Sequence, residues 1–206
     1  MAREDFNLST FISNINRRGL LSDNKYKVTI PLPRGLQNSA INLPNGLVIG
    51  ETSRMLSLMC DSTEIPGVRL NTSQNQRYGY GVPETNPYNA MLIDTLLTFY
   101  VDGQGSIWSF FNTWQQLITN LDISQGINGS TGVINGQKPF ELAYKEKYVV
   151  DMSVTVFDNM GNPKIQVKLL DSWPVAVGDV KLAWGSRNNL FKLPVWFSYR
   201  GIQNAS

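Results

Sequence analysis

The residues that bear on catalysis or phosphate binding are glycine-rich turns, and none completes a known motif. Gly79-Tyr80-Gly81 and Gly103-Gln104-Gly105 begin like the dinucleotide loop G-x-G-x-x-G, whose glycines bring backbone N–H groups close to a phosphate. The third glycine is missing from both, because Glu84 and Trp108 stand in its place. Gly136-Gln137-Lys138 lacks the Ser or Thr that would make it a P-loop. We therefore expect no nucleotide site.

Two pairs of carboxylates are candidates for the acid and base of a glycosidase. They are Glu141 with Glu146, and Asp158 with Asp179. Such a pair needs a defined separation across a cleft. The sequence indicates neither, so we interpret all four as solvated carboxylates.

The absence of histidine removes the commonest catalytic chemistry. The chain of 206 residues has no His and a single cysteine, Cys60. A Ser-His-Asp triad, a Cys-His pair and an imidazole metal ligand are thereby excluded, as are an internal disulfide and a thiolate metal cluster. We predict that the protein is not an enzyme and needs no cofactor or metal.

Net charge and hydropathy give no indication that the chain binds nucleic acid or spans a membrane. The net charge of +2 is too small to predict affinity for nucleic acid or for a membrane surface, and no apolar run reaches the roughly 18 residues of a transmembrane helix. The charged share of 17% is low against the usual ~25%, which suggests surface covered by partners. The N-terminus lacks the apolar core of a signal peptide, so we expect folding in a cytoplasm.

The first ninety residues combine a helix, strands and a long polar hairpin. Residues 5–18 predict a helix with Leu8, Phe11, Ile12 and Ile15 on one face, packed either on its own domain or on a neighbouring subunit. We predict strands at 24–32 and 53–61, with a loop over 33–52 between them.

Residues 67–90 form a polar stretch with three aromatics and two prolines. We interpret them as a hairpin that reaches away from the core, because its alternation is polar on both faces. Such a hairpin is either mobile or paired with another chain. Val68 and Leu70 have strand propensity, which favours pairing.

The middle of the chain predicts a strand, an aromatic helix and a loop. Residues 92–102 form the strand, and Ser106 is placed to cap a helix over 107–119 that has no charged residue. Such a helix either exposes its polar side to water or has that side covered by a partner. Residues 123–139 are rich in Gly, Asn and Ser and predict a loop.

The last third is β-structure by its alternation. Strands around residues 148–156 and 165–169 flank a hairpin turn, and a closing strand follows at 191–199. Pro194 cannot donate to a ladder, so we expect an edge or a bulge there. The predicted fold class is mainly β (α+β): an antiparallel β-barrel or sandwich with one helix between strands, an N-terminal helix and a long extended hairpin.

The tryptophans leave a binding function open. An alternative interpretation is a β-sandwich module that binds glycans through exposed indoles. Most of the five lie in periodic apolar patterns and are expected in the core, whereas Trp196 lies on the polar side of its strand. They are Trp108, Trp114, Trp173, Trp184 and Trp196.

A passage near the C-terminus resembles a known family. It runs Trp173, Pro174, Val177 and Gly178 through alternating hydrophobic residues to Trp184, then to polar residues and a closing strand. This pattern is similar to that of the tail tube proteins of contractile-tailed bacteriophages. The strand and aromatic helix upstream also resemble that family.

The resemblance implies a single tail-tube-like domain over 1–206. Residues 1–20 would be a helical arm, and 33–52 and 123–139 would be insertions or loops. Copies would form hexameric rings that stack into the inner tube of a contractile tail, either as its repeating subunit or as a related subunit that starts the tube at the baseplate.

The implied partners are further copies of the chain, adjacent tube or baseplate rings, the sheath protein and a tape-measure protein in the lumen. Phage DNA would pass without specific binding, no membrane would be involved, and the protein would reside in the virion after synthesis in the host cytoplasm. Lysines that grip phosphate would oppose passage, so we expect Lys164, Lys168 and Lys181 outside the lumen or in subunit contacts.

The resemblance also implies that the N-terminal segment and the hairpin mediate contacts between rings. The candidate contact residues are Leu8, Phe11, Ile12, Ile15, Arg69, Asn71, Gln74, Arg77, Tyr78 and Tyr80.

Overall fold

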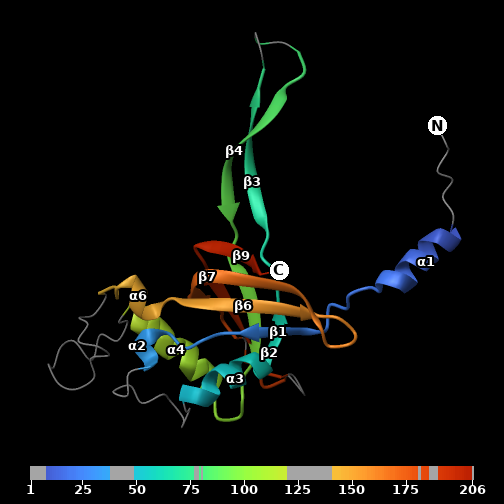
Figure 1. Ribbon diagram of the computed structural model, residues 1–206. Coiled ribbons are helices and arrows are strands. Elements are labelled where there is room, and N and C mark those ends of the chain that lie inside the picture. The colour runs from blue at the N-terminus through green and yellow to red at the C-terminus, as the bar shows by residue number, and fades with distance from the viewer. Residues whose placement is uncertain are drawn as a thin grey trace.

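The computed structural model describes residues 8–37, 49–76, 79, 81–119, 141–180, 182–185 and 190–205. Most of the described elements are β-strands (Figure 1). The elements are α1 (Leu8–Arg18), β1 (Tyr26–Thr29), α2 (Arg34–Gln37), α3 (Ile49–Met59), β2 (Cys60–Thr63), β3 (Val68–Asn75), β4 (Glu84–Leu92), β5 (Thr95–Tyr100), α4 (Ser106–Ile118), α6 (Lys145–Tyr148), β6 (Val150–Phe157), β7 (Pro163–Val177), β8 (Lys192–Ser198) and β9 (Gly201–Ala205).

One antiparallel sheet forms the body of the molecule. Its strand order is β1-β6-β7-β8-β5-β2, and β9 also pairs with β7. The two end strands approach each other, because the Tyr26 hydroxyl on β1 donates to the backbone carbonyls of Cys60 and Asp61 on β2. Burial raises the pKa of that hydroxyl, with Cys60 and Asp61 adding to the shift. The sheet is therefore open, with its two end strands approaching each other at Tyr26, and we call this curved body the barrel.

The long strand β7 bends at Asp171 and so turns one sheet into two layers. Before the bend β7 pairs with β6 and β9, and after it β7 pairs with β8. Asp171 has a φ of 51°, a left-handed conformation that Asp tolerates better than most residues. Its carboxylate lies 3.5 Å from Lys145 Nζ and 3.1 Å from Arg200 Nε, and its N–H donates to Asp151 Oδ1. These contacts hold the bend in place.

A second β-ribbon leaves the barrel altogether. The strands β2 and β5 pair within the barrel, and their continuations β3 and β4 pair only with each other. Figure 1 shows this hairpin standing far above the body. Where it departs, the Tyr199 hydroxyl donates to the Ile93 carbonyl at 2.8 Å, which ties the end of β8 to the start of β5. We call this junction the fork.

The core is built around α4. Trp114, Phe110 and Phe111 are fully buried, and Phe111 stacks against Trp114 with the ring centroids 6.3 Å apart. Phe197 of β8 meets both Phe111 and Trp114 edge-on. The indole N–H of Trp114 donates to the Tyr148 carbonyl at 2.9 Å, so its polar atom is satisfied inside the core.

Asp102 rather than Ser106 caps α4. The cap position is Gly105, with a φ of 70°, and Ser106 is the first helical residue. Asp102 Oδ1 accepts the Ser106 N–H at 2.7 Å and the Ile107 N–H at 3.3 Å, while its Oδ2 accepts the Ser106 hydroxyl at 2.8 Å. The prediction that Ser106 caps the helix was wrong, because the carboxylate four residues earlier serves the free N–H groups.

The predicted fold class is confirmed, and most predicted elements are present. The hairpin, the aromatic helix and the β-rich last third all form. The prediction of a strand at 53–61 was wrong. Residues 49–59 form α3, because Thr52, Met55, Leu56 and Met59 meet the core at helical spacing, and the strand β2 begins only at Cys60.

Pro194 lies in the interior of the sheet rather than at an edge, which corrects that prediction. β8 pairs with β5 along its length and with β7 as far as Val177. The Pro194 carbonyl accepts the Gly178 N–H on the β7 side, just where that ladder ends. An N–H at residue 194 would point to the same side, past the last paired residue of β7, so the proline removes none of the described ladder bonds.

Two predicted loops fall wholly or partly outside the described residues. These are 123–139 and the 38–48 part of the segment 33–52. Residues 34–37 of the latter form α2, in which Gly35 packs against Leu117 of α4.

Replacing Trp114 tests the core. We predict that Trp114→Phe lowers the free energy of unfolding by about 2 kcal/mol, because it removes buried volume and the bond to the Tyr148 carbonyl. Trp108→Phe is the matched control, since Trp108 is 47% exposed on the same helix and should change stability by under about 0.5 kcal/mol. Urea unfolding measures both, and equal effects would contradict this assignment of the core.

Replacing Asp102 tests the cap and its pH dependence. Burial raises the pKa of Asp102, but the hydrogen bonds from Ser106 and Ile107 outweigh it and leave the pKa below its ordinary value. A lowered pKa means stability that is present above the unfolded-state value of about 4 and is lost as pH falls through the folded-state pKa.

We therefore expect Asp102→Ala to destabilise the fold by about 1 kcal/mol at neutral pH. The difference from the parent chain should shrink in acid, as measured by thermal unfolding across pH. A difference that stays constant down to the acid limit would show that the carboxylate does not act as a charged cap.

Candidate functional site

No catalytic centre is assembled in the part of the chain that the structure describes. Within those residues, no group of three or more His, Cys, Asp or Glu side chains is placed to hold a metal. Burial, with Asp61 adding to it, raises the pKa of the Cys60 thiol to about 12, so this cysteine is not a nucleophile at neutral pH. None of the described helices is long and apolar enough to cross a membrane.

The four candidate carboxylates have ordinary structural surroundings. Asp158 forms an ion pair with Lys164 at 3.8 Å and accepts the Met160 N–H in the turn between β6 and β7. Glu141 and Asp179 are exposed. Glu146 lines a cleft beside α6, together with Asp151 and Asp171.

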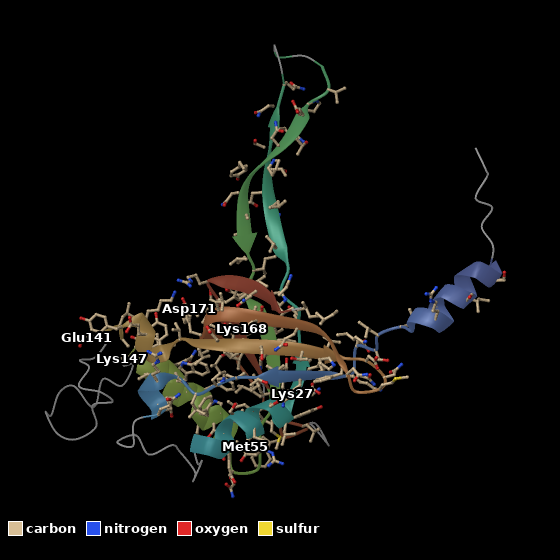
Figure 2. All side chains as sticks on the ribbon, in the orientation of Figure 1. Lys27, Met55, Glu141, Lys147, Lys168 and Asp171 are labelled. Atoms are coloured by element: carbon tan, nitrogen blue, oxygen red, sulfur yellow. The ribbon has the colours of Figure 1, made fainter. Side chains whose placement is uncertain are left out.

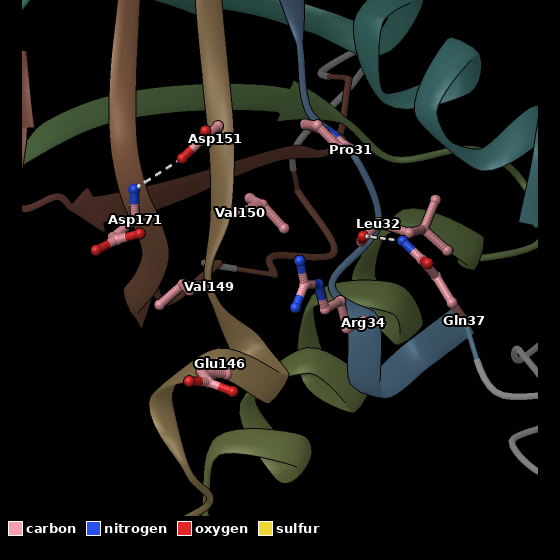
Figure 3. A pocket seen from close by; sticks show the side chains of 9 residues that line it. All are labelled: Pro31, Leu32, Arg34, Gln37, Glu146, Val149, Val150, Asp151 and Asp171. Carbon is pink, nitrogen blue, oxygen red and sulfur yellow. Dashed lines mark hydrogen bonds between the residues drawn. The ribbon is translucent and has the colours of Figure 1, made fainter. Parts of the chain in front are cut away.

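That cleft lies between α2, α6 and the bend of β7 (Figure 3). It has a volume of about 440 Å³, and Arg34 lines it together with Glu146, Asp151 and Asp171. The N–H of Asp171 and the ammonium of Lys168 hold the pKa of Asp151 below its ordinary value. Lys168 lies 3.0 Å from Asp151, so Asp151 and Asp171 are already paired with cations that fix the bend.

The tryptophans divide between core and surface. Trp114 is fully buried and Trp173 is half-buried against Tyr148, with the ring centroids 5.8 Å apart. Trp196 is at the margin of exposure, whereas Trp184 is completely exposed. The expectation that most tryptophans lie in the core was wrong, because only Trp114 of the five is buried, Trp108 is 47% exposed, and Trp184 is the most accessible indole.

The motif at residues 173–184 has a structural role at the turn out of β7. Pro174 is buried and Val177 is half-buried beside the core. A Cβ on Gly178 would lie 2.6 Å from Pro194 Cγ and 2.8 Å from Trp196 Cζ3. Only glycine lets the chain pass this close to β8, and the Gly178 N–H then bonds to the Pro194 carbonyl at 2.7 Å.

The hairpin presents its candidate residues on two different faces. Arg69 and Asn71 alternate onto one face of β3, whereas Gln74 shares the other face with Val68 and Leu70. Arg77, Tyr78 and Tyr80 lie outside the described residues. The structure therefore places three of the six hairpin candidates and does not gather them on one surface.

The apolar residues at the base of the hairpin were not singled out as a contact surface from the sequence. The side chains around the fork are between 37% and 58% exposed and have no core of their own. Cross-strand pairing puts Val68 opposite Leu92 and Leu70 opposite Ala90. This fork patch consists of Ile65, Val68, Leu70, Leu92 and Ile93.

The N-terminal helix α1 also exposes apolar side chains. It stands well away from the barrel (Figure 1), and Leu8 and Ile12 are 60% and 48% exposed. Ile15 is half-buried, and the side chain of Phe11 lies outside the described ones. An amphipathic helix of this length is marginal in water without a surface to pack on. The sequence left open whether this helix packs on its own domain or on a neighbouring subunit, and in the structure it does not lie against the barrel.

The outward face of the β1-β6-β7-β9 layer is polar. Lys27 and Lys168 lie on it (Figure 2), in register with Thr155 and Gln203 on neighbouring strands. Lys164 and Lys168 are ion-paired with Asp158 and Asp151, respectively, and Lys181 lies outside the described residues. The lysines of this layer that were predicted to avoid a lumen are thus partly neutralised by carboxylates of the same chain.

Comparison with protein families gives a match over nearly the whole chain. The profile of the family described as "Phage tail tube protein" matches residues 21–202. No curated protein sequence is significantly similar to the chain.

Several solved structures share the fold at low sequence identity. A chain from the baseplate of the anti-feeding prophage superimposes with a TM-score of 0.55 at 12% identity, covering 91% of this chain and 97% of that one. A chain from the sheath–tube complex of the PVC extracellular contractile injection system gives 0.51 at 10% identity, covering 98% and 99%. A chain from the tube-terminating cap of the anti-feeding prophage gives 0.51 at 12% identity over the full length of both.

Replacing Gly178 tests the role of the motif. We predict that Gly178→Ala lowers the free energy of unfolding by about 2 kcal/mol, because the new methyl overlaps Pro194 and Trp196. Gly185→Ala is the matched control, since no atom lies within 4 Å of a Cβ placed there. Chemical unfolding measures both. If Gly178→Ala is as stable as the control, the glycine is not required by close packing.

Proposed function

Because the chain belongs to the phage tail tube protein family, a family of structural proteins rather than enzymes, we propose that its copies assemble into hexameric rings that stack into a tube for phage DNA. A contractile sheath surrounds this tube in the proposal, and the protein is a component of the virion. The solved structures above support the fold of such a subunit.

The observation that supports assembly most directly is the hairpin of β3 and β4. Its backbone is paired, but it leaves the barrel at the fork and has no core beneath it. A two-stranded hairpin alone is only marginally stable in water. Contact with another copy would supply the missing packing, and rotational symmetry would let every copy give and receive the same contact.

The candidate contact residues keep that role in the proposal. On the hairpin they are Arg69, Asn71 and Gln74, and on α1 they are Leu8, Ile12 and Ile15. We propose that the chain is one tube domain, with 1–20 as its arm and with the segments 33–52 and 123–139 as additions to it. Its partners would be like copies, adjacent tube or baseplate rings, the sheath and a tape-measure protein.

Passage of DNA requires a wall that does not hold phosphate. The ion pairs of Lys164 and Lys168 support this part of the proposal, because a neutralised lysine attracts a polyanion less than a free one. DNA is then a transient passenger without a specific site.

Shortening the hairpin tests the proposal. Deletion of residues 71–85 removes most of β3 and leaves Val68 and Leu70 near their β4 partners, Leu92 and Ala90. We expect the variant to keep the melting temperature of the barrel and to lose stacking, as judged by electron microscopy and thermal unfolding. Tubes of normal length from the shortened chain would refute the role of the hairpin in stacking.

A further inference from the structure

The fork patch and α1 are two apolar surfaces that the barrel leaves uncovered within the described residues. Resting on the proposed function, we propose that α1 of one copy packs into the fork patch of a second copy. The patch contains Ile65, Val68, Leu70, Leu92 and Ile93, all of them more than a third exposed.

The shape of the fork suits a helix. The hairpin stands up from the barrel where β5 begins, so a corner lies between the base of the hairpin and the barrel (Figure 1). Val68 and Leu70 share one face of β3, and their cross-strand partners Leu92 and Ala90 continue that face on β4. A short helix lying along this corner would cover Val68, Leu70 and Leu92, the patch residues that share this face.

The spacing on α1 fits such a corner. Leu8, Ile12 and Ile15 lie at intervals of four and three residues, so they form one stripe along the helix. Ser13 and Arg17 lie off this stripe, and both are exposed. The stripe is therefore the one apolar side that the described part of α1 offers to a partner.

Charge favours the same pairing. Glu64 and Asp94 flank the fork, are exposed, and take part in no ion pair within the described residues. Arg69, on the opposite face of β3 from Val68, is the cation closest to Glu64 in sequence. The segment of α1 ends in Arg17 and Arg18 and has no acidic residue. Because Arg17 lies off the stripe, this attraction orients the helix at a distance rather than by a fixed ion pair.

The proposed contact joins α1 of one chain to the fork patch of another, and a second copy of the chain is therefore the proposed partner. The arm and the fork are different surfaces, so the contact joins unlike surfaces, and a repeated contact of this kind closes a ring or continues along a tube. In the structure α1 and the fork of the same chain stand apart (Figure 1).

Cross-linking between two full-length chains tests the inference. Both chains carry Cys60→Ser; one also carries Ile12→Cys and the other Val68→Cys. We expect a short bis-maleimide to link the two chains when they are mixed, and neither chain to link to itself. The matched control pair is Ser13→Cys with Arg69→Cys, which places the thiols on the opposite faces of α1 and β3. This pair should remain unlinked.

A second pair of variants measures the association of the two chains without a cross-linking reagent. Ile12→Asp and Val68→Asp should each weaken association roughly tenfold or more, because each buries a charge in the contact. Their mixture should form a dimer that neither variant forms alone, since one intact arm still meets one intact fork. Sedimentation velocity measures both effects, and thermal unfolding checks that each variant is folded.

Each other outcome overturns the inference. If the parent chains assemble but the test pair links no better than the control, the arm binds elsewhere and only this inference fails. If a single chain with both Ile12→Cys and Val68→Cys links within itself, α1 folds back on its own fork. If the parent chain stays monomeric throughout, the proposed function fails together with the inference.

Discussion

One constraint determines how this molecule can be stabilised: the ribbon of β3 and β4 extends beyond the hydrophobic core of the barrel. Up to the fork, each strand of the ribbon has the barrel beneath it, and Leu97 and Phe99 of β5 are fully buried. Beyond the fork the same two strands continue with their backbone bonds satisfied and their apolar side chains in water. Backbone pairing alone stabilises such a hairpin weakly. A chain built in this way is completed by contact with another molecule.

The barrel supplies the rigidity that makes such contacts reproducible. The bend at Asp171, held by Lys145 and Arg200, lets β7 serve both layers, and Gly178 lets the chain leave β7 in close contact with β8. The aromatic helix α4 fills the interior. The fork is thereby fixed to a well-packed body, and the Tyr199 hydroxyl ties β8 to the base of the hairpin. Rigid placement of exposed apolar surface is what repeated assembly requires.

Much of this architecture follows from the sequence, and the exceptions have physical reasons. The alternation in β6 and β7 and the aromatic stripe of α4 predict those elements because each has one buried face. The helix α3 was missed because its apolar residues also alternate locally, and only the helical spacing from Thr52 onward separates the two interpretations. The strand β9 is short and contains just one large apolar residue, Ile202, so tertiary pairing rather than pattern creates it. The fork patch depends on where two ribbons part, which no local pattern encodes.

The central claim is that this polypeptide associates with its own copies. Sedimentation velocity of the full-length chain over a wide range of protein concentration tests it most directly. The account predicts that larger particles appear and grow as concentration rises, with rings or tubes visible in the same samples by electron microscopy. A single sedimenting species with the mass of one chain, 23.1 kDa, at every concentration would contradict it.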